Sequence, residues 1–125
     1  MKKFRAGRAI LAGDSAHVNS PIGAMGMNSG IHDAFNLGEK LVSILRGEAD
    51  ADILDRYERQ RRHVALQHTQ AQTMRNKRLL TEKDPAVRRK NHDELRRTAE
   101  DPKLARAFLL RSSLIESLRE AEQIA

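Results

Sequence analysis

Glycine is distributed very unevenly along this chain, and the distribution limits the folds open to it. All seven glycines lie at or before Gly47, five of them between Gly13 and Leu41, and the 78 residues after Gly47 contain none. Glycine adopts backbone conformations that other residues avoid, whereas a long segment without it suits helix. We therefore expect a strand, a glycine-rich loop and a first helix in residues 1–47. Residues 48–125 should form a helical C-terminal segment, as part of one structural unit.

The N-terminal part has two expected elements. The apolar run Arg8–Gly13 is short and closed by glycine, which is typical of a buried strand. A helix should begin near Gly26 or Met27 and continue to Arg46, because apolar residues recur there at three-, four- and seven-residue intervals. Gly47 then provides the C-terminal stop.

The helical segment has its own start signals. Asp50 or Asp52 can cap the first of its helices, and Asp84–Pro85 and Asp101–Pro102 each combine a capping carboxylate with proline at the first helical position. The last helix should present a broad apolar face made by Leu104, Phe108, Leu110, Leu114, Ile115 and Leu118. The predicted fold class is mainly α, with one short N-terminal strand and a glycine-rich loop followed by about four helices.

The composition indicates a small apolar core and bears on the cellular location of the protein. Only three Phe, one Tyr and no Trp are present, so large buried side chains are scarce and apolar helix faces should need a partner. We expect a homo-oligomer rather than a monomer.

Cysteine is absent, which excludes disulfides and zinc sites of the cysteine type. No apolar run approaches the length of a membrane span or a signal-peptide core, so the predicted location is the cytoplasm.

The net charge is +6 with a pI near 10.2, which raises the question of nucleic acid. The excess lies in residues 56–97, where 13 Lys or Arg face 5 Asp or Glu. Tyr57 is the only aromatic residue there, so the stacking surface expected of a single-strand binder is missing. The pattern favours a solvated or partner-facing helical surface, and nucleic acid binding is not expected.

The run "GDSAHVNSPIGAMGMNSG" has the features of a ligand loop. Gly23 and Gly26 allow close approach of the backbone, and free N–H groups at a helix start near Gly26, Met27 and Asn28 attract negative charge. Asp14 follows the expected strand, where its carboxylate can accept hydrogen bonds from ligand hydroxyls or serve as a turn cap. Spacing of this kind alone is weakly specific.

The segments "GDSAH", "PIGAMGMNSG" and "DAFNLGEKL" together resemble the second FAD-binding motif of the class A flavoprotein monooxygenases, the aromatic-ring hydroxylases of the p-hydroxybenzoate hydroxylase type. The following "LDRYERQRR" is similar to the next helix of that family. The resemblance implies that the chain is a C-terminal fragment of the family's α/β FAD-binding fold.

The resemblance also implies roles for six residues. Asp14 is expected to bind a ribityl hydroxyl of FAD, and Pro21 to lie against the isoalloxazine ring. The N–H groups of Met27 and Asn28 are expected to face the flavin N1 and C2 carbonyl, with the backbone of Gly23 and Gly26 close by. No catalytic residue is expected, because the flavin carries the oxygen chemistry.

The histidines are not predicted to form a site. In the family, the histidine at the position of His17 belongs to the structural frame of the motif, and His32 suits packing or surface. His63 and His68 are five residues apart, off the four-residue spacing that places two ligands on one face of an α-helix. We therefore expect no metal site.

The chain lacks the GxGxxG and DG motifs of the complete enzymes and is not expected to hydroxylate alone. One interpretation is a C-terminal portion of a flavin-dependent monooxygenase, acting with a complementary N-terminal FAD-binding chain and using NAD(P)H only when a complete enzyme is assembled. A second is a non-enzymatic, self-associating helical module that retains the motif as structure. A third, a basic helical nucleic-acid binder, is disfavoured by the missing aromatics.

Overall fold

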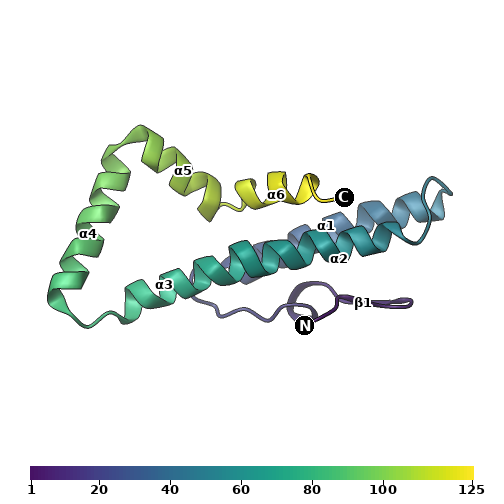
Figure 1. Cartoon of the computed structure of the whole chain (residues 1–125), viewed down its shortest axis with the longest axis horizontal. Coiled ribbons are helices and arrows are strands. Elements are labelled where there is room, and N and C mark those ends of the chain that lie inside the picture. Colours follow the sequence, from purple (N-terminus) through teal and green to yellow (C-terminus); the bar gives the residue numbers. More distant parts are fainter.

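The computed structural model describes all 125 residues, which form a small hairpin followed by helices (Figure 1). The elements are β1 (Arg5–Ala6), β2 (Ala9–Ile10), the 3-10 turn η1 (Gly13–Ser15), α1 (Met25–Leu45), α2 (Ile53–Val64), the π-helical turn η2 (Ala65–Gln70), α3 (Ala71–Thr81), α4 (Pro85–Glu100), α5 (Pro102–Ser112) and α6 (Ile115–Glu122). The mainly α fold class is confirmed. Because α2, η2 and α3 follow one another without a break, they form one long rod, against which α1 packs.

The N-terminal strand differs from the expected one. The predicted strand over Arg8–Gly13 is present only as β2, which pairs antiparallel with β1 in the register Arg5↔Ile10 and Ala6↔Ala9. Gly7 has φ +59°, a left-handed conformation that reverses the chain between the two strands. The strand therefore finds its partner locally.

The predicted boundaries of the first helix are confirmed to within two residues. Helix α1 begins at Met25 and ends at Leu45, and Gly47 follows with φ +72° as the stop. Asp52 occupies the N-cap position of α2, but its side chain makes no capping hydrogen bond, so this cap is positional only.

The two Asp–Pro starts are confirmed with their caps. Asp84 Oδ1 accepts from the N–H of Ala86 at 2.7 Å, and Asp101 Oδ1 accepts from the N–H of Lys103 at 2.8 Å. Proline occupies the first turn of both α4 and α5. Figure 1 shows α4 leading away from the rod and α5 returning toward it.

The expected last helix is two helices. Leu114 has φ +62° and is buried, and it separates α5 from α6. The break turns α6 back along α2, where Gln60 Nε2 donates to the carbonyl of Ala121 at 2.8 Å. A left-handed leucine is unfavourable by itself. The docking of α6, with Leu114 itself buried, is what holds it there.

The apolar core is small and lies where the N-terminal segment meets the rod. Phe4, Ala16, Tyr57 and Ala65 form it, and the Tyr57 hydroxyl donates to the carbonyl of Leu11 at 2.8 Å. Burial is the main reason that the pKa of Tyr57 is raised well above its ordinary value. None of the helices is both long and apolar enough to cross a lipid bilayer.

Helix α1 turns a polar face inward and an apolar face outward. Ser29, Asp33 and Lys40 are buried. Met27 and Phe35 are 75% and 70% exposed, and Ile31, Val42 and Leu45 are also exposed. These side chains form a contiguous run of exposed apolar residues along one face of α1.

Candidate functional site

The glycine-rich loop is held against α1 by a glycine–glycine contact. Gly13 has φ +59°, and a Cβ on Gly30 would lie only 3.4 Å from the Cα of Gly13. The turn η1 therefore packs closely on the second turn of α1. This contact sets the position of Asp14, the next residue in the loop.

A buried carboxylate, Asp33, anchors the same loop. Its Oδ2 accepts from the N–H of Gly13 at 2.8 Å and pairs with His17 Nε2 at 2.5 Å, while its Oδ1 accepts from Arg61 Nε at 2.5 Å. Burial raises the pKa of Asp33, but the hydrogen bonds from His17 and Arg61 outweigh burial and leave the pKa below its ordinary value. The loop, α1 and α2 thus meet at one ionised group.

His17 has the structural position that the sequence indicated. Its ring is buried between Asp33 and Phe4, with the Phe4 and His17 ring centroids 5.8 Å apart. Its Nε2 is engaged with Asp33, and its Nδ1 is buried without a hydrogen-bond partner. No ring nitrogen of His17 faces the exposed surface of the loop.

Asp14 lies on η1 and is exposed. The cap of this turn comes from Ser15, whose Oγ accepts from the N–H of Ala12 at 3.2 Å and donates to its carbonyl at 2.8 Å. The Asp14 carboxylate therefore does not serve as the cap of this turn.

The start of α1 is open to solvent. Its N-cap residue, Ala24, has φ +54°, makes no side-chain cap, and no acidic residue lies in the first turn. The first N–H groups of a helix have no intrahelical partner, so an uncapped start carries a partial positive charge. Met27 and Asn28 are exposed on this turn, and Gly26 is half-buried.

The loop before this helix is built tightly. Gly23 has φ +92°, and a Cβ there would lie 2.2 Å from Asn76 Nδ2 on α3. Asn19 Nδ2 donates to Thr73 Oγ1, also on α3, at 2.9 Å. Pro21 is exposed, and its carbonyl accepts from the N–H of Ala24 at 3.0 Å. Contacts with α3 thus fix the approach to the helix start.

The six predicted site residues therefore occupy one loop and the helix turn that it leads into, and five of them are exposed. Sequence reasoning missed two residues that hold this loop, Asp33 and its ion-pair partner Arg61. The available signal was Asp33 itself, an acid in the middle of an apolar helical pattern and the first residue of "DAFNLGEKL".

A separate cavity of about 340 Å³ lies between α3, α4 and α5. Arg75, Arg97 and Arg111 contribute to its lining, together with Leu79 and Phe108. No predicted site residue reaches it, so the cavity is separate from the loop.

Comparison with known families agrees with this arrangement. The family described as "FAD binding domain" matches residues 1–72 of the 125, a range that contains the loop, α1, α2 and the Asp33 network. The chain belongs to the FAD binding domain family.

Its relatives are monooxygenases. Para-nitrophenol 4-monooxygenase of Pseudomonas sp. is 34% identical over 121 residues, 97% of this chain and 30% of that protein. Pentachlorophenol 4-monooxygenase of Sphingobium chlorophenolicum is 53% identical over 64 residues, 51% of this chain and 12% of that protein. The crystal structure of p-nitrophenol 4-monooxygenase from Pseudomonas putida superposes with a TM-score of 0.84 at 36% identity, over 93% of this chain and 29% of the other. The chain thus spans less than a third of the length of these relatives.

Proposed function

We propose that this chain is the flavin-side, C-terminal portion of an FAD-dependent monooxygenase of the aromatic hydroxylase type. The observation that carries the proposal is the exposed Asp14 carboxylate on η1, a turn that packs on α1, together with the uncapped start of the same helix. An acid that accepts hydrogen bonds from hydroxyls suits the ribityl chain of a flavin, and a positive helix end suits negative charge on its ring.

The residues present fit the cofactor. Asp14 would accept a hydrogen bond from a ribityl hydroxyl, and the N–H groups of Met27 and Asn28 would hold the polar edge of the ring. Gly23 and Gly26 would leave room for close approach of the backbone, and Pro21 would border the ring. The positive end of α1 would stabilise negative charge on the ring.

The bound flavin supplies the redox and oxygen chemistry, and the chain binds and orients it. No side chain of this site acts as an acid or a base in the proposal, because the one histidine of the loop is engaged by Asp33. NAD(P)H enters only in an assembled enzyme.

The partner in this proposal is an N-terminal FAD-binding portion. The relatives are more than three times longer than the matched region. The exposed Met27, Ile31 and Phe35 of α1 form an apolar stripe that such a portion covers. Under this proposal residues 1–47 bind the flavin, and residues 48–125 support them.

The same stripe favours a second candidate, a self-associating helical module that keeps the motif as structure. A second copy of the chain would bury Phe35 and its neighbours equally well. In that case the FAD motif would survive because Asp33 and the glycine contact are needed for folding. The two candidates differ in whether the chain alone binds flavin.

The deciding experiment is a titration of the purified, desalted chain with FAD, followed by flavin fluorescence and the visible spectrum. Saturable binding with a shifted spectrum supports the flavin half-site. A chain that is folded by circular dichroism but leaves the flavin spectrum unchanged contradicts it and favours the self-associating module.

A further inference from the structure

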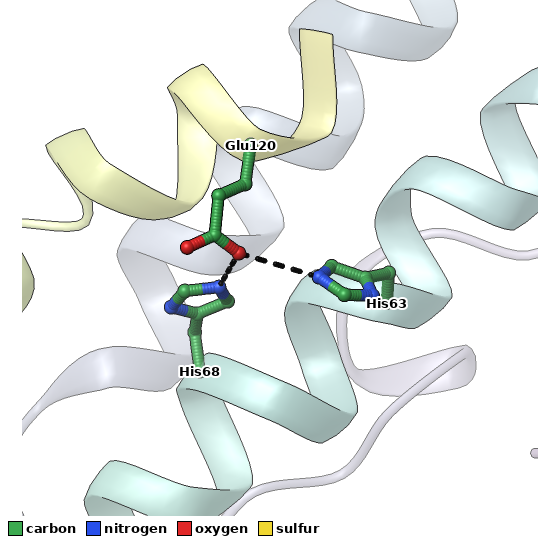
Figure 2. A group of neighbouring side chains, drawn as sticks. All are labelled: His63, His68 and Glu120. Carbon is green, nitrogen blue, oxygen red and sulfur yellow. Dashed lines mark hydrogen bonds and ion pairs between the residues drawn. The ribbon is translucent and has the colours of Figure 1, made fainter. Parts of the chain in front are cut away.

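We propose that His63, His68 and Glu120 form a binding site for a divalent transition-metal cation of the Zn²⁺ class, located where α6 docks on the central rod. The proposal is independent of the flavin site. Figure 2 shows the three side chains directed toward one another from α2, η2 and α6.

The three donor atoms are close enough to share one ion. His68 Nε2 lies 2.8 Å and His63 Nε2 3.4 Å from the same Glu120 oxygen, Oε2, and one ligand atom from each residue lies within 4.8 Å of the other two. Ligands at 2.0–2.1 Å from a tetrahedral ion are separated by about 3.3 Å. The observed separations require only small side-chain adjustments to admit an ion.

The π-helical turn is the reason that these histidines meet. In an unbroken α-helix, residues five apart point in different directions, so His63 and His68 could not bind the same ion. A π-turn closes its hydrogen bonds at five residues instead of four. Because η2 begins at Ala65, between the two histidines, it brings them onto one face, with ring centroids 6.0 Å apart.

The ligand set selects the class of metal. Two imidazole nitrogens and one carboxylate suit Zn²⁺ and similar cations, whereas Mg²⁺ and Ca²⁺ prefer oxygen ligands throughout. Three protein ligands leave a fourth position for water. His63 and Glu120 are partly exposed, so an ion can enter from solvent.

The positive charges around the site oppose an ion that is held by electrostatic attraction alone. Arg106, Arg111 and Arg119 line the same surface hollow as Glu116 and Glu120. A site with several arginines nearby should hold an ion that forms strong bonds to nitrogen, rather than one held by charge alone.

A bound ion would cross-link α6 to the rod. Glu120 lies 52 residues from His68 in sequence, and α6 is already docked by Gln60, which donates to the carbonyls of Ala121 and Ile124. The helix is therefore positioned without the metal, and the metal adds stability to an arrangement that exists beforehand.

The test is a titration of the chelator-stripped full chain with ZnCl₂ by calorimetry near pH 7.5, with thermal unfolding followed by circular dichroism. We expect one equivalent to bind and the Tm to rise with Zn²⁺ but not with Mg²⁺. Glu120→Gln and His68→Gln remove ligands while keeping side-chain size. Each should weaken binding by at least the roughly 10–100-fold that loss of an outer-shell partner costs.

His92→Gln is the matched control, because His92 is exposed on α4, away from the cluster. It should bind Zn²⁺ like the parent. The proposal is overturned by a parent chain that shows no saturable binding, by ligand variants that bind like the parent, or by a control that loses affinity equally.

A second readout separates coordination from a folding defect. Co²⁺ in a tetrahedral site with nitrogen ligands gives visible absorption, which Zn²⁺ should abolish by displacement. The Glu120→Gln variant should keep the helical signal of the parent but lack this absorption. Equal absorption in both chains would contradict the site.

Discussion

Arg61 Nε donates to Asp33 Oδ1 at 2.5 Å, and both side chains are buried almost completely. The pair joins α2 to α1, and through Asp33 it also holds His17 and the backbone of Gly13. The glycine-rich loop therefore depends on the buried ion pair between Asp33 and Arg61.

Asp33→Ala should destabilise the chain strongly. The change leaves the Arg61 guanidinium buried without its carboxylate, and breaking a buried pair in this way costs about 3–5 kcal/mol. Urea unfolding followed by circular dichroism measures the loss. Asp93→Ala on the surface of α4 is the control and should change stability by less than about 0.5 kcal/mol. A similar small effect for both variants would contradict the anchoring role.

Acid should weaken the fold through Asp33. Its pKa is below the ordinary value of 3.8 when folded, so the unfolded chain takes up a proton first as the pH falls. The stability due to this shift is complete above the ordinary pKa and is lost as the pH drops through the folded pKa. Urea midpoints measured across this range should decline in the parent and decline less in Asp33→Asn. If the urea midpoints of the parent and of Asp33→Asn fell equally with pH, titratable groups other than Asp33 would be responsible for the loss of stability in acid.

Asp14→Ala and His17→Ala should separate binding from stability. Asp14→Ala should weaken any FAD binding and leave the free energy of unfolding unchanged, because the turn is capped by Ser15. The His17 change should mainly lower stability, because the ring is buried against Asp33. FAD titration and urea unfolding of both variants check this. Asp50→Ala, a change of an exposed acid outside the loop, is the binding control. Unchanged flavin affinity in Asp14→Ala would remove the proposed role of that residue.

Gly23→Ala and Gly38→Ala should have opposite effects. Gly23 has φ +92° and a Cβ there would meet Asn76 Nδ2, so alanine should cost more than about 1 kcal/mol. Gly38 lies within α1 with open space around it, and alanine should stabilise the helix by roughly 0.5–1 kcal/mol. Thermal unfolding of the two variants gives the comparison. Stabilisation by both changes would mean that the tight loop is not required.

The apolar stripe of α1 should cause association. We expect the chain alone to sediment as a dimer or larger assembly at low micromolar concentration, and Phe35→Lys to shift it toward monomer, since Phe35 is 70% exposed. Leu80→Lys changes an exposed apolar residue of α3 and should leave the mass unchanged. A parent chain that sediments as a compact monomer would exclude this self-association.

The sequence by itself determined the mainly α fold class and the ends of several helices. Gly47, Asp84 and Asp101 act through hydrogen bonds and backbone conformations within one turn of their own positions. A few consecutive residues are therefore enough to predict these helix ends. The motif likewise placed the loop and the helix start together, because both lie in one continuous segment.

Tertiary structure decided the remaining features. Asp33 is an anchor because Gly13 and His17, at least 16 residues earlier, and Arg61, 28 residues later, are brought to it by the fold. Leu114 ends a helix because α6 docks on α2. The turn η2 brings His63 and His68 onto one face, and the docking of α6 places Glu120, from the far end of the helical segment, beside them. Each of these outcomes depends on contacts between residues far apart in sequence, whose energy outweighs the local preference for an unbroken α-helix.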